Sequence, residues 1–336
     1  MSIQRNVNRI TLKDVASRCG YSANTVSRAL RGDKLLPQST QEQIRQVAHD
    51  MGYVPNSSAS TLRLGSSRMV AVVINDINNP YYTNMVGELD EYLSEQKYKL
   101  MILPCRDDER IAENMLKLAI SQCVDGIVFF PYNNIEHIRL LRRSSIPFVM
   151  LDRWLPGVEE NVVRMDDEAG GYAAADCLLR RSHKQILYIA GPDVNSSQSD
   201  RQRGIEKAVA ELGQGKATLT VLPWESLPEG LKTTDYRALF DPKAYSAVIA
   251  YNDYIAYHCM NDLHAHGIAI PQDVALIGFD YIRRYNSCFP PLSSVSTDGS
   301  CVSRVAAELL VEHMLYPHAP KREIVLPVRI HHDGTT

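Results

Sequence analysis

The sequence predicts an all-α helix-turn-helix head, followed by an α/β body of two doubly wound lobes. Three observations support this fold class. Apolar residues recur at helical spacing between residues 12 and 52, whereas short apolar runs alternate with amphipathic helices from Met69 onward. The charge also changes along the chain: residues 1–68 contain ten Lys and Arg against four Asp and Glu, and residues 69–336 contain 26 against 35.

The length and composition are those of a globular protein with more than one core. The chain has 336 residues, of which 45% are apolar and 22% charged. It contains no apolar run that resembles a membrane span or a signal peptide, so we expect it in the cytoplasm. The seven cysteines are scattered without a C-x-x-C spacing, so we expect reduced core thiols and neither a metal nor another cofactor.

The first two helices of the head are marked by their apolar spacing and by the residues between them. Apolar residues over 12–19 predict the first helix, and Gly20 supplies the turn that follows. Ser22 is a favourable N-cap for a second helix, in which Val26 and Ala29 face inward together with Leu30.

A third helix is predicted after a loop. Ser39 and Glu42 have the spacing of a capping box and indicate where it begins, and Gly52 indicates where it stops. Its inward residues are expected to be Ile44, Val47, Ala48 and Met51. The three helices together predict a helix-turn-helix fold with one additional helix.

The stretch SANTVSR, residues 22–28, begins the second helix, which enters the major groove in proteins of this architecture. Arg28 can contact a guanine edge, Asn24 can pair with adenine, and Ala23 is small enough to meet a thymine methyl group. A solvated helix surface would also explain a polar run in isolation, but the capped helices and the positive charge favour double-stranded DNA as the partner. Three further hydroxyl groups can reach phosphates or base edges: Ser22, Thr25 and Ser27.

The body shows the pattern of parallel sheets with crossover helices. Strand, polar loop, helix and strand follow one another over residues 69–103 and again over 185–222, which implies two similar lobes. The nine predicted strands lie at 69–74, 99–103, 126–130, 147–151, 185–191, 218–222, 246–250, 274–279 and 322–328.

The segments TLKDVASRCGYSANTVSRAL (11–30) and GYVPNSSASTLRLGSSR (52–68) resemble the lactose-repressor (LacI/GalR) family of bacterial transcription regulators. The motifs T-L-x-D-V-A, T-V-S-R and G-Y-x-P-N occur in the order and at the spacing of that family, and the resemblance covers nearly the whole chain. It implies that Ala23, Asn24 and Arg28 read bases, with phosphate contacts from Thr11, Ser22 and Thr25.

The resemblance also implies the domain organisation. The head would comprise residues 1–55, the hinge helix and linker 56–68, and a periplasmic-binding-protein-like body 69–336. We expect lobe 1 at about 69–154 and 288–320, and lobe 2 at about 155–287 and 321–336. In the hinge helix, Leu62 would enter the minor groove with Ala59 packed close by, and Asn56 would join the DNA-binding residues.

A small-molecule effector is expected in the cleft beyond the carboxyl ends of the strands. Carboxylates, amides and an arginine can bond sugar hydroxyls, and an aromatic ring can stack on a pyranose or nucleobase, although loop Asp and Asn residues also form turns. The resemblance places Arg201 at the R-x-x-G position that contacts the effector. The expected effector-binding residues are Asp76, Asn79, Tyr82, Asp152, Trp154, Ser197, Arg201, Asn252 and Asp280.

We therefore predict a homodimeric, effector-responsive repressor, with a sugar, sugar phosphate or nucleoside-like effector. Two heads would grip a pseudo-palindromic operator, since one head reads only a few base pairs. The sequence contains no G-x-S-x-G, H-E-x-x-H or P-loop motif, which argues against an enzyme. The other alternative is a binding protein that only stores or senses a sugar. Such a protein would keep its function after deletion of the head, whereas a repressor would lose operator binding.

Overall fold

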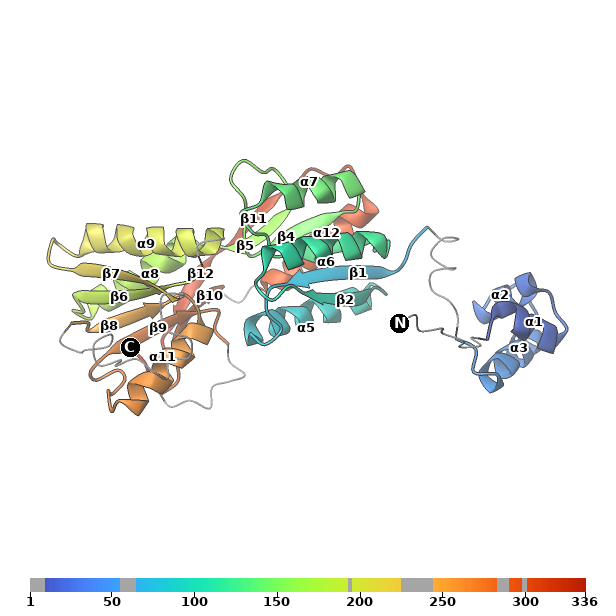
Figure 1. Cartoon of the computed structure of the whole chain (residues 1–336), viewed down its shortest axis with the longest axis horizontal. Coiled ribbons are helices and arrows are strands. Elements are labelled where there is room, and N and C mark those ends of the chain that lie inside the picture. The colour runs from blue at the N-terminus through green and yellow to red at the C-terminus, as the bar shows by residue number, and fades with distance from the viewer. Residues whose placement is uncertain (1–9, 55–64, 193–194, 225–243, 283–289, 298–300) are drawn as a thin grey trace, which may run out of the picture. The chain divides into compact units, whose positions relative to one another are not determined.

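The computed structural model describes residues 10–54, 65–192, 195–224, 244–282, 290–297 and 301–336. The chain divides into two compact units, Met1–Ser67 and Arg68–Thr336, whose elements are labelled in Figure 1. The part of the predicted hinge that contains Asn56, Ala59 and Leu62 lies outside the described residues.

The first unit contains α1 (Leu12–Cys19), α2 (Ala23–Leu30) and α3 (Gln38–Asp50). Thr11 caps α1 in a capping box with Asp14, and Gly20 ends this helix in the left-handed conformation. Ser22 caps α2 by accepting a hydrogen bond from the backbone N–H of Thr25, as predicted.

The predicted start of the third helix is wrong. Helix α3 begins at Gln38 behind Pro37 and has no side-chain cap, because the fixed φ of proline already directs the chain into the first turn. Ser39 therefore lies inside the helix, and Glu42 accepts a hydrogen bond from the Gln38 amide instead. The small core of the head consists of Val15, Ala16, Val26, Ala29, Ile44 and Ala48.

The second unit contains two six-stranded sheets of the same design. Their strand orders are β11-β5-β4-β3-β1-β2 and β12-β10-β9-β8-β6-β7, and among the described strands only β10 and β12 pair antiparallel. The first sheet comprises β1 (Met69–Ile74), β2 (Lys99–Pro104), β3 (Gly126–Phe129), β4 (Phe148–Leu151), β5 (Val162–Met165) and β11 (Glu323–Leu326). The second comprises β6 (Gln185–Ala190), β7 (Thr218–Pro223), β8 (Ala247–Ala250), β9 (Ala275–Phe279), β10 (Ser293–Thr297) and β12 (Val328–His331).

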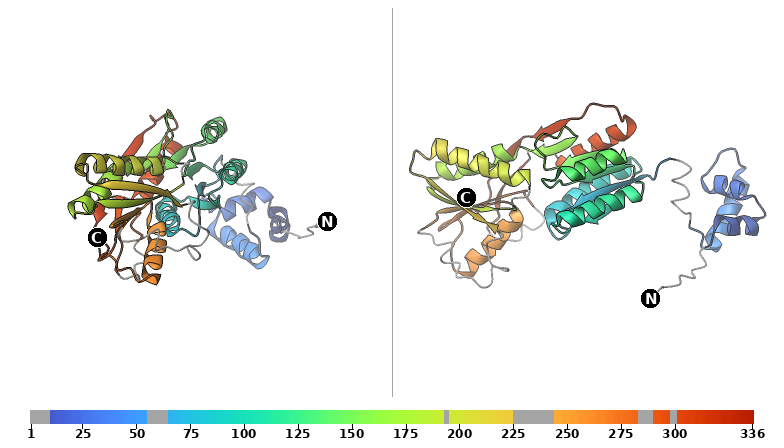
Figure 2. Two further views of the ribbon diagram at one scale, coloured as in Figure 1. Left: turned by 60° about the vertical axis from the view of Figure 1, so that its left-hand side comes forward. Right: turned by 45° about the horizontal axis from the view of Figure 1, so that its top comes forward.

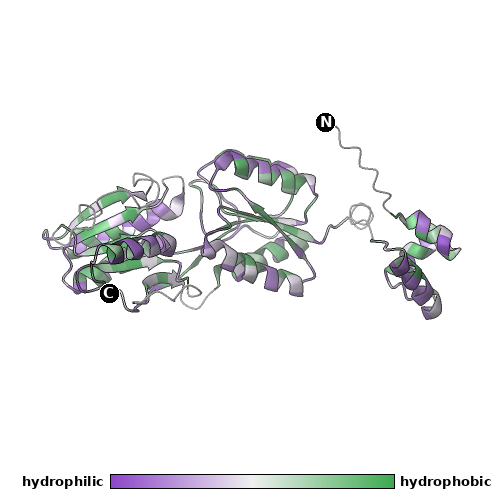
Figure 3. Cartoon of the chain, turned by 60° about the horizontal axis from the view of Figure 1, so that its bottom comes forward, coloured by the Kyte–Doolittle hydropathy of each residue, from purple (hydrophilic) through white to green (hydrophobic). Residues whose placement is uncertain are grey.

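Helices cover both faces of each sheet (Figure 2). In the first lobe, α5 (Pro80–Glu95) and α12 (Val302–Leu315) pack on one face, and α6 (Glu109–Ser121) and α7 (Ile135–Ser144) on the other. In the second lobe, α8 (Asp167–Arg180) and α9 (Ser196–Leu212) lie opposite α11 (Asp253–Ala265). Because both faces are covered, the central strands β1, β3, β4, β6, β8 and β9 are almost continuously apolar, and green predominates in the sheets in Figure 3.

The lobe boundaries differ from those predicted. Strands β5 and β11 belong to the first sheet and β10 to the second, whereas the sequence pattern placed each of them in the other lobe. The run 322–328, predicted as one strand, is divided at Pro327, which lacks an N–H for the ladder; β11 pairs with β5, and β12 pairs with β10. Strands β5 and β10 were not predicted at all, because VVRM and SSVST are short and partly polar.

The order of five strands in each sheet places a switch point between β1 and β3, and another between β6 and β8. In doubly wound sheets, ligands bind beyond the carboxyl ends of the strands at such points. None of the described helices is long and apolar enough to cross a bilayer. The described cysteines are all unpaired, and Cys105, Cys177 and Cys259 are buried as expected, whereas Cys123 is exposed.

Candidate functional sites

The beginning of α2 is the candidate nucleic-acid interface. Asn24 is exposed there, and the Ser22 hydroxyl lies 2.9 Å from the hydroxyl of Thr25. Ala23 is half-buried beside them. Thr11 is exposed at the start of α1, where its hydroxyl donates to Asp14 at 2.7 Å. These residues leave polar groups accessible at two helix N-termini of the head, which suits contacts with phosphates.

Two residues of this stretch depart from the expected picture. Ser27 is only 9% exposed because it faces the helix packing, so its expected contact with DNA is not supported. Arg28 is partly exposed, and its Nε donates to the Asp33 carboxylate at 2.7 Å. This hydrogen bond holds the pKa of Asp33 below its usual value. Asp33 thus orients the Arg28 guanidinium in the protein without DNA.

A pocket of about 310 Å³ lies between the two lobes at the carboxyl ends of their strands. Four of the expected effector-binding residues line it: Asp76, Asn79, Tyr82 and Asn252. Asn79 and Asn252 also cap α5 and α11, and Asp76 accepts two hydrogen bonds from Asn78. The sequence left open whether these Asp and Asn residues form turns or line the pocket. In the structure the same side chains do both.

The other residues that line this pocket were not predicted from the sequence. The same rule, a polar or aromatic residue just after a strand, would have found Asp107 after β2, Tyr132 after β3 and Trp224 after β7. Trp224 and Tyr254 both lie against the ring of His258, which gives the second-lobe wall an aromatic character. The other missed lining residues are Asn75, Arg153, Pro192, Asn195, Tyr251, Tyr254 and Ile255.

Three expected effector residues connect the lobes instead of lining this pocket. The buried Asp152 carboxylate accepts a hydrogen bond from Tyr81 at 2.8 Å, and its backbone carbonyl accepts one from the Ser197 hydroxyl of α9 at 3.1 Å. The Trp154 indole N–H donates to Asp200 of α9 at 2.9 Å. The bonds to Ser197 and Asp200 join the segment after β4 to the second lobe, whereas the bond from Tyr81 lies within the first lobe.

Arg201, expected to contact the effector, is enclosed within the second lobe. Only 2% of its side chain is exposed, and it does not line the pocket between the lobes. Its Nε donates to Asp167 at 2.6 Å, and its Nη1 donates to the carbonyl oxygen of Tyr251 at 2.5 Å. Its guanidinium lies over the rings of Tyr251 and Phe279, 4.8 and 4.5 Å from their centroids. Arg201 therefore braces the loops that carry the pocket, and direct contact with a ligand does not follow from its position.

Several buried carboxyl groups surround this arginine. Burial raises the pKa of Asp167 to about 6, against the opposing effect of Arg201. Burial also raises the pKa of Asp253 to about 7, although Ser294 and the backbone N–H of Ile282 donate to its carboxylate. The pKa of Asp280 is raised well above its usual value for the same reason. As the pH falls, Asp167, Asp253 and Asp280 therefore become protonated at a higher pH than an exposed aspartate does.

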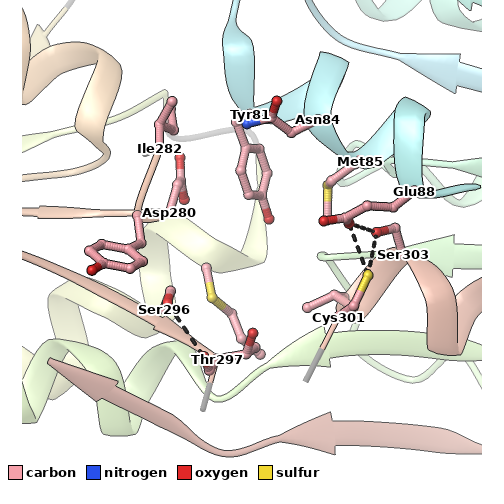
Figure 4. A pocket seen from close by; sticks show the side chains of 13 residues that line it. Tyr81, Asn84, Met85, Glu88, Asp280, Ile282, Ser296, Thr297, Cys301 and Ser303 are labelled. Atoms are coloured by element: carbon pink, nitrogen blue, oxygen red, sulfur yellow. Dashed lines mark hydrogen bonds between the residues drawn. The ribbon is translucent and has the colours of Figure 1, made fainter. Parts of the chain in front are cut away.

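Asp280 lies at a second pocket, of about 170 Å³, and not at the first (Figure 4). Its carboxylate is 3.6 Å from Nη2 of Arg201, and its backbone has a φ of 99°. Tyr81 faces the same pocket from α5, and Glu88 accepts hydrogen bonds there from Cys301 and Ser303 at the start of α12. The described residues contain no group of three His, Cys, Asp or Glu side chains that could hold a metal ion.

Comparisons with known proteins match both parts of the chain. Residues 11–56 match the model described as bacterial regulatory proteins, lacI family, and residues 175–336 match the model of a periplasmic binding protein-like domain. The HTH-type transcriptional regulator DegA of Bacillus subtilis is 28% identical over 293 residues, which cover 86% of each chain. The HTH-type transcriptional repressor CytR of Escherichia coli is 25% identical over 323 residues, covering 95% of this chain and 94% of that relative.

Solved structures share the whole architecture. A complex of the transcriptional regulator CelR with cellobiose has a TM-score of 0.69 and 25% identity, and the match covers 98% of this chain and 100% of that chain. The lac repressor dimer bound to operator and the anti-inducer ONPF has a TM-score of 0.81 and covers 98% of this chain and 99% of its own; at 20% identity it shows the common fold.

Proposed function

The chain belongs to the lacI family of bacterial regulatory proteins, and from this premise we propose that it is a cytoplasmic, homodimeric repressor whose operator affinity is switched by a sugar-like effector. It is a DNA-binding transcriptional regulator with a ligand-binding body and not an enzyme. A dimer presents two α2 helices to the two halves of a pseudo-palindromic operator, which lengthens the sequence that is read. The hinge residues Asn56, Ala59 and Leu62 remain proposed DNA contacts.

The observation that carries the effector response is the pocket between the lobes. Its lining combines Asp76, Tyr82 and Arg153 of the first lobe with Asn195 and Trp224 of the second. A ligand that contacts both sets favours one relative position of the lobes over another. The CelR complex with cellobiose supports a sugar as the ligand class. Asp152, Trp154 and Ser197 act in this proposal as connections between the lobes that respond to closure, because they bond across them.

Ligand binding and DNA binding are coupled only if the ligand has a different affinity for the DNA-competent and DNA-incompetent dimers. The hydrogen bonds that Asp152, Trp154 and Ser197 form across the lobes can supply this coupling, since they respond to closure of the lobes on a ligand. We propose that this change in the body decides whether the two hinges can pair on DNA.

The test is selection of binding sites from random double-stranded DNA by the full-length chain, followed by the same selection with Arg28→Ala. We expect a pseudo-palindromic site from the wild type. The variant should lose about 1–3 kcal/mol and relax one base position in each half-site. Arg45→Ala, an exposed substitution on α3, is the matched control and should keep the wild-type preference. Failure to enrich any twofold site, or an Arg28 variant that selects the wild-type site unchanged, would refute the assignment.

A further inference from the structure

Among the described residues that line the pocket between the lobes, Arg153 is the only cation, and its guanidinium is nearly unpartnered. It lies two residues after β4 and is only 4% exposed. Its Nη2 donates to the Tyr82 hydroxyl at 3.0 Å, but Nε and Nη1 are buried without a hydrogen-bond partner. The neighbouring Asp152 carboxylate favours the charged guanidinium electrostatically, but among the described contacts it forms no ion pair with Arg153 and accepts its hydrogen bond from Tyr81.

A buried cation in this state is costly. A guanidinium stays protonated at every physiological pH and carries five N–H donors, so it cannot relieve its burial by losing a proton. Removal of an ion from water costs several kcal/mol unless an opposite charge and hydrogen bonds compensate. The described residues supply one hydrogen bond to Arg153, and the pocket is the open space beside it.

The negative charges of the pocket are located elsewhere and already have partners. Asp107 is exposed at the rim, where it accepts a hydrogen bond from the Asn75 amide at 2.9 Å. Asp76 is partly exposed and accepts from Asn78. The pocket therefore has carboxylates near solvent and, at its buried end, a cation with two unpartnered nitrogen atoms, which is an arrangement for a ligand with hydroxyl groups at one side and an anionic group at the other.

Building on the proposed function, we propose that the effector is a sugar acid whose carboxylate pairs with Arg153. A carboxylate carries a single charge and matches the single guanidinium. A phosphate monoester carries a charge of about −1.5 to −2 at pH 7 and would place more negative charge beside the buried Asp152 than a carboxylate does. The rim carboxylates accept hydrogen bonds from the hydroxyl groups, and Trp224 offers a face to the ring. The volume of about 310 Å³ suits a single monosaccharide unit.

The experiment compares matched ligands on the full-length chain by isothermal titration calorimetry. The panel pairs glucose with gluconate and glucuronate, and galactose with galacturonate, and adds the two hexose 6-phosphates. We expect the tightest binding from a carboxylate-bearing member. Arg153→Gln should weaken this binding by about 100-fold, since it removes one partner of a buried charge pair. Arg143→Gln, an exposed substitution on α7, should leave it unchanged.

The melting temperature without ligand checks the variant itself. Arg153→Gln should melt no lower than the wild type, because it removes buried nitrogen atoms that have no hydrogen-bond partner; a clearly lower value would show that the fold already satisfies the guanidinium and would contradict the proposal. Tightest binding of a neutral or phosphorylated sugar, an acid that binds Arg153→Gln as well as wild type, or no acid binding at millimolar concentration would also overturn it. Operator binding measured with each ligand separates the two proposals: a neutral sugar that changes operator affinity refutes the sugar acid alone, whereas a sugar acid that binds without changing it refutes the regulatory function.

Discussion

Replacing Arg201 by methionine should mainly lower the free energy of unfolding of the body. It should not remove a direct contact with the ligand. Methionine keeps an apolar stem of similar length but removes the guanidinium. Asp167 then loses its partner at 2.6 Å, and the carbonyl oxygen of Tyr251 loses its donor, while both groups remain buried. Breaking one side of a buried ion pair costs about 3–5 kcal/mol, and we expect a loss of that size in the free energy of unfolding at pH 8.

The loss should be smaller at low pH. Burial already raises the pKa of Asp167 to about 6, and removal of the nearby cation raises that pKa further. Between about pH 6 and pH 8 the folded variant therefore binds a proton that the wild type does not, so the cost of the substitution grows by up to about 1.4 kcal/mol per pH unit as the pH rises. At pH 5.5, which is below the pKa of Asp167 in both proteins, this carboxyl group is mostly protonated, and the two stabilities should approach each other.

Urea unfolding followed by tryptophan fluorescence measures this effect directly. The chain has two tryptophans, Trp154 and Trp224, and both lie in the body. Asp167→Asn added to Arg201→Met should restore part of the stability at pH 8, because it removes the carboxylate that lost the 2.6 Å partner, whereas Asp280 still lacks the cation 3.6 Å away. A loss below about 1 kcal/mol in Arg201→Met, together with abolished effector binding, would refute the bracing role and return Arg201 to the ligand site.

Three further outcomes are expected. Gly204→Ala should destabilise the body severely, or prevent its folding, because a Cβ there would lie 2.0 Å from the carbonyl oxygen of Glu168 across the α8–α9 contact; circular dichroism melting of the variant tests this. Asp253→Asn should flatten the pH dependence of the urea midpoint between pH 5 and pH 8: the pKa of Asp253 is raised from 3.8 to about 7, so its stabilising contribution is full below 3.8 and is lost as the pH rises through 7. Ser22→Ala should cost the head about 1 kcal/mol, because it removes the oxygen that caps the N–H of Thr25, and should lower operator affinity without changing the binding of ligand to the body.

The fold could largely be predicted from the sequence because its signals are local. The spacing of apolar residues marked the helices of the head, and eight apolar runs marked eight parallel strands. The crossings between lobes could not be predicted in this way. Strand β10 reads SSVST, and the run around Pro327 is continuous in hydrophobicity, so only the pairing of β11 with β5 and of β12 with β10 shows where the chain changes lobe.

The candidate site was predicted in part for a similar reason. A rule based on strand ends selected Asp76 and Asn252, which line the pocket, but it could not distinguish side chains that enter the pocket from those that pair within the fold. Arg201 and Arg153 illustrate this limit. Both are buried arginines near strand ends or their loops, and only the three-dimensional partners show that the first is neutralised by Asp167 while the second faces the pocket.

The most direct test of the account is the operator affinity of the full-length chain, measured by fluorescence anisotropy with the pocket empty and with it saturated by the tightest ligand of the sugar panel. Coupling between a ligand site and a DNA site is typically about 1–3 kcal/mol, so the account predicts a change in operator affinity of about 5- to 150-fold. An operator affinity that is the same with the pocket empty and saturated would contradict the claim that the body controls the head.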